Sequence, residues 1–390
     1  MITVDQALEQ LFALVSPLRA ETVPLTQAVG RVLAEDAVAT RDQPPFAASA
    51  MDGYAVRGQE VSVGARFKVI GESAAGHGFD GICGAGEAVR IFTGAPLPEG
   101  ADHVVIQEDV ARDGDCVTLT DRLGDGDNVR PAGADFRAGD RLKAPRLLRP
   151  SDIALLASMN IAEAVVARRP DVALISTGDE LVMPGEDPGP DQIIASNTFG
   201  LKALLDGIGA RARILPIAGD SKPLLEAAFD LAKDADLIVT IGGASVGDHD
   251  LVGDVAESLG MERAFYKIAM RPGKPLMAGR MGNAVMVGLP GNPVSAMVCG
   301  HVFLAPVIRA MLGLGAGPAP RRSARLGADL PANGPREHYM RAFVRDGEIT
   351  AEARQDSSLL TVLADANALL IRPAHDGPRK AGDNVSYLQI

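Results

Sequence analysis

Hydrophobic positions recur with two different periods along this chain, and the changes of period divide it into predicted units. Residues 3–15 carry apolar side chains at helical spacing behind Thr3 and Gln6, which form a capping-box pattern, so we expect an amphipathic helix there. A run rich in Pro and small residues at 40–50 indicates a linker. From about 52 to 140, short β-like runs alternate with Gly and Asp clusters, as in a small β-rich unit.

The second half of the chain alternates between strand-like and helix-like patterns. Buried strands are predicted at 172–176, 213–216, 237–241 and 284–289, with helical segments between them and a long helix at 294–312. This alternation predicts a doubly wound α/β sheet, whose ligands bind at the C-terminal ends of the strands. A Gly- and Pro-rich stretch at 313–320 leads to short strands and turns, which predict a small C-terminal β domain.

We therefore expect a multidomain α/β protein with four units. Residues 1–41 and 141–169 would form one discontinuous α+β domain, because helix-containing segments flank a mostly β insert at 42–140. Residues 170–317 would form the doubly wound domain and residues 318–390 the small β domain. The length of 390 residues agrees with several domains, since a single domain usually holds roughly 100–200 residues.

Composition excludes several classes of function. The formal net charge is −12, so we expect neither nucleic acid nor an acidic membrane surface as a partner, and the absence of Trp argues against base stacking. Cys83, Cys116 and Cys299 form no CxxC pair, which favours a reducing cytoplasm over a disulfide framework or a zinc site. Asp5 and Glu9 interrupt the first apolar segment, which is unlike a signal peptide, and no long uncharged apolar stretch predicts a membrane span.

Two loops that follow predicted strands combine glycine with acidic residues. STGDE at 176–180 places a turn and two carboxylates at a strand end, with an ordinary helix-capping turn as the alternative. GGASVGDHD at 242–250 follows a buried strand, and its glycines would let backbone N–H groups approach a phosphate. It has neither a Walker A ending nor GxGxxG spacing, and a simple glycine turn is the alternative. The candidate binding residues here are Thr177, Gly178, Gly242, Gly243, Ser245 and Gly247.

Two further loops are rich in cations and proline. One stretch of eight residues carries three cations, Lys267, Arg271 and Lys274, although the chain as a whole is acidic. Neighbouring prolines forbid a regular helix there, so a rigid anion-binding site is favoured over a solvated charged surface. GLPGNPVS at 288–295 offers Asn292 as a helix N-cap and Pro293 as the first helical residue, with free N–H groups directed above the sheet. The candidates in this loop are Pro290, Asn292, Pro293 and Ser295.

Carboxylates at predicted strand ends and turns are the remaining chemical signal. No Ser/His/Asp or Cys/His triad can be argued from spacing, whereas several acids accompany the predicted phosphate site. Oxygen ligands beside phosphates suit Mg²⁺, so the pattern indicates phosphate or pyrophosphate chemistry on a small ligand. These acids are Asp52, Glu180, Asp220 and Asp250.

Six segments together resemble those of the MoeA-type molybdopterin molybdenumtransferases, which are related to the E domain of gephyrin. They follow the family order and span almost the whole chain, so their joint occurrence is specific although each alone is an ordinary loop. The segments are SAMDGYAVR (49–57), IFTGAPLPEGAD (91–102), STGDEL (176–181), GGASVGDHD (242–250), KIAMRPGKP (267–275) and GLPGNPVSA (288–296).

The resemblance implies a reaction and a set of residue roles. Adenylylated molybdopterin and molybdate would give molybdenum cofactor and AMP, with Mg²⁺, on a molybdopterin-binding α/β domain. Glu180, Asp220 and Asp250 would bind metal and phosphate. The cationic loop would hold molybdate or the terminal phosphate, although the family often has Lys at the position of Arg271 and a planar guanidinium donates differently. The insert would contribute Asp52, Thr93, Arg130 and Asp135.

The same resemblance implies a homodimer with active sites shared between subunits. A molybdopterin adenylyltransferase and recipient molybdoenzymes would be further partners. Two other functions remain open at this point. An adenylyltransferase would resemble residues 170–315 but would not need the insert or the C-terminal domain, and a cofactor-binding scaffold would not need the carboxylates.

Overall fold

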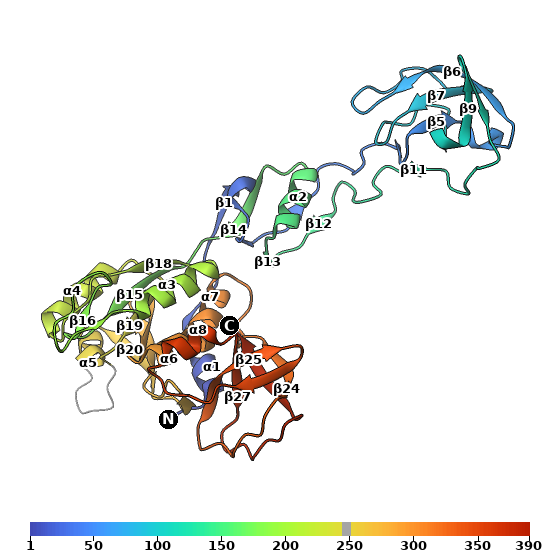
Figure 1. Cartoon of the computed structure of the whole chain (residues 1–390). Coiled ribbons are helices and arrows are strands. Elements are labelled where there is room, and N and C mark those ends of the chain that lie inside the picture. Colours follow the sequence, from blue (N-terminus) through green and yellow to red (C-terminus); the bar gives the residue numbers. More distant parts are fainter. Residues whose placement is uncertain (244–250) are drawn as a thin grey trace.

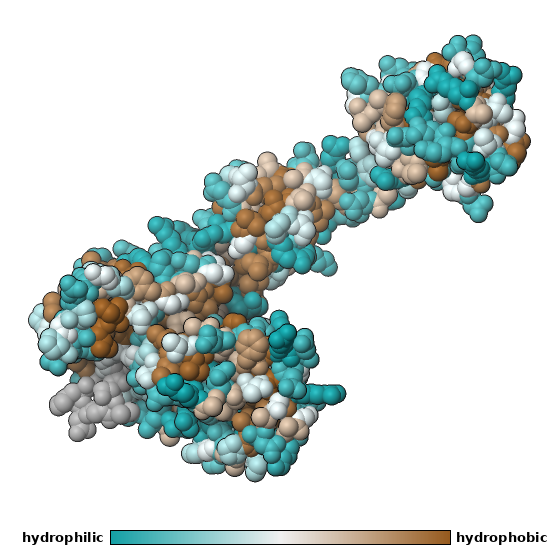
Figure 2. Space-filling model, viewed as in Figure 1, coloured by the Kyte–Doolittle hydropathy of each residue, from teal (hydrophilic) through white to brown (hydrophobic). Residues whose placement is uncertain are grey.

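The chain has an elongated shape in the computed structural model, which describes residues 1–243 and 251–390 (Figure 1). The β-rich insert lies at one end and is joined through a smaller middle unit to the α/β unit and the C-terminal β unit, which lie side by side at the other end (Figure 1). The space-filling view shows the same slender connection between the insert and the rest of the molecule (Figure 2). The predicted fold class, a multidomain α/β chain, is confirmed.

A six-stranded sheet forms the α/β unit, in the order β18-β15-β19-β23-β22-β20. The first four strands are parallel, and the last two pair antiparallel at one edge. The strands are β18 (Arg211–Ile214), β15 (Asp171–Ser176), β19 (Leu237–Ile241), β23 (Ala284–Leu289), β22 (Met277–Met281) and β20 (Met261–Tyr266). Sequence patterns predicted the four parallel strands but missed β20, in which the exposed Glu262 and Arg263 interrupt the apolar alternation, and β22, in which Gly279 and Arg280 interrupt it.

Helices cover both faces of this sheet, as expected of a doubly wound fold. Along β15, Val172 and Leu174 enter the core of one face, whereas Ala173 and Ile175 enter the core of the other. The first face is covered by α3 (Asn197–Gly207), α6 (Pro293–Cys299), η4 (Gly300–Leu304) and α7 (Ala305–Met311). The second is covered by α4 (Lys222–Ala232) and α5 (Leu251–Ser258).

The long helix predicted at 294–312 is one continuous helical segment from Pro293 to Met311 with a π-helical turn in its middle. By length and composition alone it could cross a membrane, and it is one such helix among the described residues. However, 78% of its apolar window is buried inside the structure, as in a core helix. Its apolar character therefore reflects packing against the first face of the sheet.

Helix α1 (Val4–Leu14) has the predicted capping box between Thr3 and Gln6 but lies in a different unit from the one expected. Its buried residues, including Leu8 and Leu11, belong to the core of the first sheet face. Tyr339 and Leu369 of the C-terminal unit join the same core. The assignment of the first helix to the discontinuous domain is thus corrected, because its apolar stripe joins the α/β unit to the C-terminal unit.

The middle unit brings together chain segments on either side of the insert. Its sheet has the order β1-β14-β2-β13, from β1 (Ala20–Pro24), β14 (Glu163–Ala167), β2 (Val32–Leu33) and β13 (Arg146–Leu147). Further elements are η1 (Leu25–Gln27), α2 (Pro150–Ser158) and the paired strands β3 (Ala37–Val38) and β12 (Arg141–Leu142). The N-cap of α2 is Arg149, whose N–H donates to the Asp152 carboxylate at 2.8 Å.

The insert is a six-stranded sheet in the order β8-β5-β7-β6-β10-β9. Its strands are β8 (His103–Ile106), β5 (Gly53–Val56), β7 (Glu87–Ile91), β6 (Arg66–Ser73), β10 (Cys116–Leu119) and β9 (Val110–Asp113). The 3₁₀ turns η2 (Gly58–Glu60) and η3 (Gln107–Asp109) lie between its strands, and β4 (Ala48–Ser49) pairs with β11 (Val129–Arg130) at its base.

The C-terminal unit is a six-stranded sheet in which five strands close into a ring and β21 is added at the edge of β25. Its order is β21-β25-β26-β24-β28-β27, and a further pairing of β25 with β27 closes it. The strands are β21 (Met270–Arg271), β25 (Glu337–Arg345), β26 (Glu348–Ala351), β24 (Arg321–Leu326), β28 (Asn384–Gln389) and β27 (Ala368–Arg372), with the short helix α8 (Leu360–Asp365). Because β21 comes from the predicted cationic loop, that loop is a structural link between the α/β unit and the C-terminal unit.

Candidate active site

A cavity of about 970 Å³ opens at the C-terminal ends of the parallel strands β15, β19 and β23, where the doubly wound pattern predicted ligand binding. It brings together three of the four predicted loops. Nine candidate residues line it: Thr177, Gly178, Glu180, Asp220, Gly242, Gly243, Pro290, Asn292 and Pro293.

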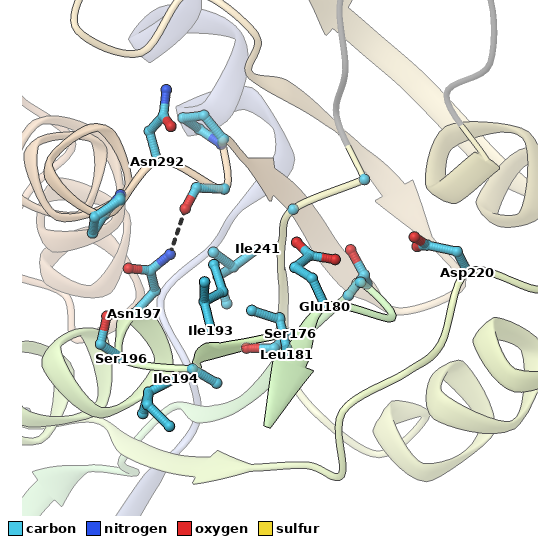
Figure 3. A pocket seen from close by; sticks show the side chains of 18 of the residues that line it. Ser176, Glu180, Leu181, Ile193, Ile194, Ser196, Asn197, Asp220, Ile241 and Asn292 are labelled. Carbon is cyan, nitrogen blue, oxygen red and sulfur yellow. Dashed lines mark hydrogen bonds between the residues drawn. The ribbon is translucent and has the colours of Figure 1, made fainter. Parts of the chain in front are cut away.

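Glu180 and Asp220 lie along one rim of this cavity (Figure 3). Their loops are fastened to each other by the N–H of Gly178, which donates to the carbonyl of Ala218 at 3.1 Å. In addition, the N–H of Asp220 donates to Oδ1 of Asp179 at 3.0 Å. The two carboxylates therefore come from separate strand ends but have a fixed relation to each other.

Gly242 and Gly243 line the cavity directly after β19 and need to be glycine. Both have positive φ, 99° and 65°. A Cβ on Gly242 would lie 2.6 Å from the carbonyl oxygen of Thr177, and one on Gly243 would lie 2.3 Å from Cγ2 of Val252. The chain therefore passes close to Thr177 and Val252 at these two positions, whereas the predicted approach of their N–H groups to a phosphate stays a prediction. Ser245, Gly247 and Asp250 of the same motif lie outside the described residues.

The N-terminus of α6 forms the opposite side of the cavity. Asn292 is the N-cap and Pro293 occupies the first turn, as predicted, although the Asn292 side chain makes no capping hydrogen bond. Nδ2 of Asn197 donates to the carbonyl of Gly291 at 2.7 Å and holds this loop to α3 (Figure 3). Ser295 differs from the prediction: it is only 3% exposed and does not line the cavity.

The cationic loop reaches the cavity only through Pro275. Arg271 is exposed on β21, and the loop continues to the half-buried Lys274. Nζ of Lys267 lies 4.6 Å from the ring centroid of Tyr266, a cation–π contact. None of the three predicted cations lines the cavity, and Arg271 lies at the joint between the α/β unit and the C-terminal unit through its pairing with His338.

Residues of the C-terminal unit that the sequence did not single out complete this joint. Ser358 lines the cavity, and the carbonyl of Ser357 accepts the N–H of Val294 at 3.1 Å. Arg341 is fully buried, and its Nη2 donates to the carbonyls of Arg354 and Asp356 at 3.2 and 2.9 Å. Within the described residues its Nε and Nη1 have no hydrogen-bond partner, so this guanidinium retains unused donors.

His338 precedes Arg341 by three residues on β25 and pairs in register with Arg271. Burial, followed by the charges of Arg271 and Arg341, lowers the pKa of His338 to about 4. A sequence signal for this cluster did exist, because a charged Arg341 stands two residues from Tyr339, on the face of β25 whose Tyr339 packs into the core shared with the α/β unit. We expect such an inward arginine to have a specific partner.

Asp52 and Thr93 of the insert bind each other. Both the N–H and the hydroxyl of Thr93 donate to Oδ1 of Asp52, each at 2.7 Å. The backbone hydrogen bond, and then the hydroxyl one, hold the pKa of Asp52 below its ordinary value, with a smaller contribution from the charge of Arg90. Arg90 is fixed by cation–π contacts with the rings of Tyr54 and Phe92, at 5.1 and 4.8 Å. Thr93 therefore positions an ionised Asp52.

A second cavity, of about 650 Å³, lies at the base of the insert and is lined by Arg130 and Asp135. Gly94, the neighbour of Thr93, lines it as well, so the four candidate residues of the insert gather in one region. The insert lies at the opposite end of the molecule from the α/β unit (Figure 1). Within one chain, the predicted site residues are thus divided between two separate regions.

No group of three or more His, Cys, Asp or Glu side chains suited to a metal ion occurs within residues 1–243 and 251–390. The predicted set of Glu180, Asp220 and Asp250 includes one acid outside this described part of the chain. Glu180 and Asp220 offer carboxylate oxygens on one rim of the cavity, and such oxygens are the donors that hard cations prefer.

Three regions of the chain match the MoeA family. Residues 2–160 match the MoeA N-terminal region (domain I and II), residues 173–310 match a probable molybdopterin binding domain, and residues 323–390 match the MoeA C-terminal region (domain IV). Together these regions account for nearly all of the sequence.

Individual relatives agree with this assignment. A molybdopterin molybdenumtransferase of Haemophilus influenzae is 36% identical over 396 residues, covering 99% of this chain and 98% of the relative. Molybdopterin molybdenumtransferase 2 of Mycobacterium tuberculosis is 38% identical over 371 residues, covering 90% of each chain. A crystal structure of a molybdopterin biosynthesis MoeA protein from Pyrococcus horikoshii has a TM-score of 0.86 at 26% identity, covering 100% of both chains. With full-length similarity in both sequence and fold, the chain belongs to the MoeA family of molybdopterin molybdenumtransferases, which act in molybdenum cofactor biosynthesis.

Proposed function

We propose that this enzyme inserts molybdate into adenylylated molybdopterin and releases AMP and molybdenum cofactor. The observation that carries the proposal is the cavity at the strand ends, where Glu180 and Asp220 face a glycine pair and the N-terminus of α6. Backbone N–H groups at a helix N-terminus bind phosphate oxygens, and carboxylates hold the cation that accompanies them. This combination suits a substrate that contains a phosphoanhydride bond.

Mg²⁺ would be held by Glu180 and Asp220, with Asp250 as a third ligand in the role that family resemblance gives it. When bound, the cation would neutralise charge on the phosphate oxygens as the bond to AMP breaks. Asp179 would keep Asp220 in place through the hydrogen bond to its N–H. Arg271, which lies close enough to Arg341 for its charge to lower the pKa of that guanidinium, would attract molybdate to the joint beside the cavity, together with Lys274.

The proposed enzyme acts as a homodimer in which each site takes residues from both subunits. Asp52 and Arg130 lie at the far end of the chain from Glu180 (Figure 1), so a shared site needs the insert of the partner subunit. Exposed apolar side chains on the middle unit, among them Val29 and Leu147, support a covered surface there. Figure 2 shows apolar surface over this unit.

We place the enzyme in the cytoplasm. There a molybdopterin adenylyltransferase would supply the substrate, and molybdoenzymes would receive the product.

Measurement of AMP tests the reaction directly. Adenylylated molybdopterin would be incubated with the enzyme, and AMP release would be followed with and without molybdate and Mg²⁺. We expect release only when both ions are present, and we expect Glu180→Gln to bind the nucleotide while losing turnover. Rapid AMP release by the wild-type protein without molybdate would contradict the coupling, and unchanged release by Glu180→Gln would remove Glu180 from the mechanism.

Mixed dimers test the shared site. Asp52→Ala and Glu180→Ala would each be inactive, but in a mixed dimer one site receives both lesions and the other receives neither. Random co-assembly gives half mixed dimers, so roughly a quarter of wild-type activity should return. Purified heterodimers without activity would show that each site forms within one chain.

A further inference from the structure

Between its acidic rim and its asparagine side, the cavity has an apolar wall that the proposed phosphate and metal chemistry does not use. Leu181, Ile193 and Ile241 line the cavity there (Figure 3). Ile193 is 58% exposed although it lines a cavity, whereas Ile241 is 2% exposed. Consequently, a large apolar surface faces the space where a ligand would lie.

The wall has a defined direction because it is a small piece of parallel sheet. Strand β16 (Leu181–Val182) pairs with β17 (Ile193–Ile194), and Leu181 is in register with Ile193. Residues in register project to the same face of a sheet, and successive residues project to opposite faces. Leu181 and Ile193 therefore form one apolar face, and Ile194, which projects from the other side of its strand, also lines the cavity.

Fixed backbone contacts tie this wall to both polar sides of the cavity. The N–H of Ile193 donates to the carbonyl of Glu180 at 2.7 Å, so the wall moves with the acidic rim. Four residues later, Asn197 is anchored to Gly291 at the N-terminus of α6 by its 2.7 Å hydrogen bond. The wall thus spans the distance between the metal-binding side and the phosphate-binding side.

We propose that the face formed by Leu181 and Ile193 binds the flat, fused heterocycle of the substrate. This inference rests on the proposed function, in which the substrate carries two such rings, adenine and pterin. An anionic group would find no donor on this face, whereas a planar ring can cover two branched side chains and remove them from water. The wall therefore selects for the ring of the ligand, and the rims bind its phosphates and metal.

Binding measurements with three probes separate ring from phosphate. Wild-type protein with Mg²⁺ would be titrated with AMP, with ribose 5-phosphate, which lacks the base, and with a free pterin. Ile193→Ser should weaken binding of a ring-bearing probe roughly fivefold to tenfold, equivalent to about 1.0–1.4 kcal/mol, and leave ribose 5-phosphate unchanged. If Ile193→Ser loses affinity for AMP, the wall binds adenine. If it loses affinity for the free pterin, the wall binds the pterin ring.

Two control variants accompany this experiment. Leu231→Ser removes an equally exposed apolar side chain, 52% exposed on α4 and remote from the cavity, and should change none of the three affinities. Ile193→Val keeps a branched apolar side chain and should restore most of the ring affinity. In turnover assays Ile193→Ser should raise KM with little change in kcat, since a surface that binds ground state and transition state alike affects KM alone.

The proposal is overturned if Ile193→Ser leaves both ring-bearing probes unaffected, or if it weakens ribose 5-phosphate to the same extent. It is also overturned if the substitution instead shifts the dimer equilibrium without changing ring affinity, because the wall would then be covered by protein. These outcomes differ from a failure of the proposed function, in which the wild-type enzyme itself releases no AMP in response to molybdate.

Discussion

Gly273 is the position in the cationic loop where a single methyl group should be most disruptive. Its φ is 109°, and an added Cβ would lie 2.6 Å from Sγ of Cys299 and 3.1 Å from Sδ of Met270. Cys299 is completely buried in α6, so its sulfur cannot move aside. Substitution with alanine therefore combines backbone strain with overpacking, directly between Arg271 and Lys274.

The expected cost of Gly273→Ala follows from these two contributions. A non-glycine residue in a sparsely populated backbone region costs of order 1–3 kcal/mol. Overpacking a core contact adds about 1–3 kcal/mol. We therefore expect the free energy of unfolding to fall by roughly 2–6 kcal/mol, with weaker binding of oxyanions such as molybdate because the loop must shift.

Denaturation by urea would measure this cost in Gly273→Ala, Cys299→Ala and the double variant. Gly282→Ala is a matched control, because Gly282 also has positive φ, 59°, but its Cβ would meet nothing within 4 Å. In Gly282→Ala, the free energy of unfolding should fall only by the cost of backbone strain. Cys299→Ala removes the sulfur and should relieve the clash. The stability lost in the double variant should therefore be smaller than the sum of the two single losses by about 1 kcal/mol or more. Additive losses, or equal losses at Gly273 and Gly282, would refute the reasoning.

Three further predictions follow from named contacts. Because the pKa of His338 is lowered to about 4, the unfolded chain binds a proton that the folded chain excludes between pH 6.5 and 4, so stability should fall as the pH falls through this window. His338→Gln should flatten that fall by up to roughly 1.4 kcal/mol per pH unit, and thermal melts showing identical pH profiles would contradict it. Lys274→Ala should weaken binding of phosphate-bearing ligands without a large change in melting temperature, because a half-buried loop lysine contributes little packing; marked thermal destabilisation would instead make Lys274 a structural residue. Asp179→Ala should lower kcat roughly tenfold by freeing the Asp220 loop, whereas Asp179→Asn, which keeps an acceptor oxygen, should retain most activity; equal losses in the two variants would assign the effect to charge.

Local sequence patterns predicted the structure correctly where it depends on residues that are close together in the chain. The capping box of Thr3 and Gln6, the strands at 237–241 and 284–289, and the position of Asn292 at the start of α6 all agree with the prediction. Helix caps and central parallel strands leave such signals because their partners are a few residues away or because both faces are buried. Edge strands leave weaker ones: β20 exposes three consecutive side chains, which hides its period.

The sequence by itself therefore determined the fold class, the order of the strand-end loops and, through their joint occurrence, the family. Only the tertiary structure decided which of these loops share a cavity. It showed that Glu180 and Asp220 lie on one rim, whereas Asp52 lies in a distant unit. It also introduced Ser358, which lines a cavity formed mostly by the α/β unit, and the buried Arg341, whose partners Arg354 and Asp356 lie more than ten residues along the chain. The physical reason is that a local pattern records burial and capping, whereas a site is assembled by long-range packing, which no short stretch of sequence encodes.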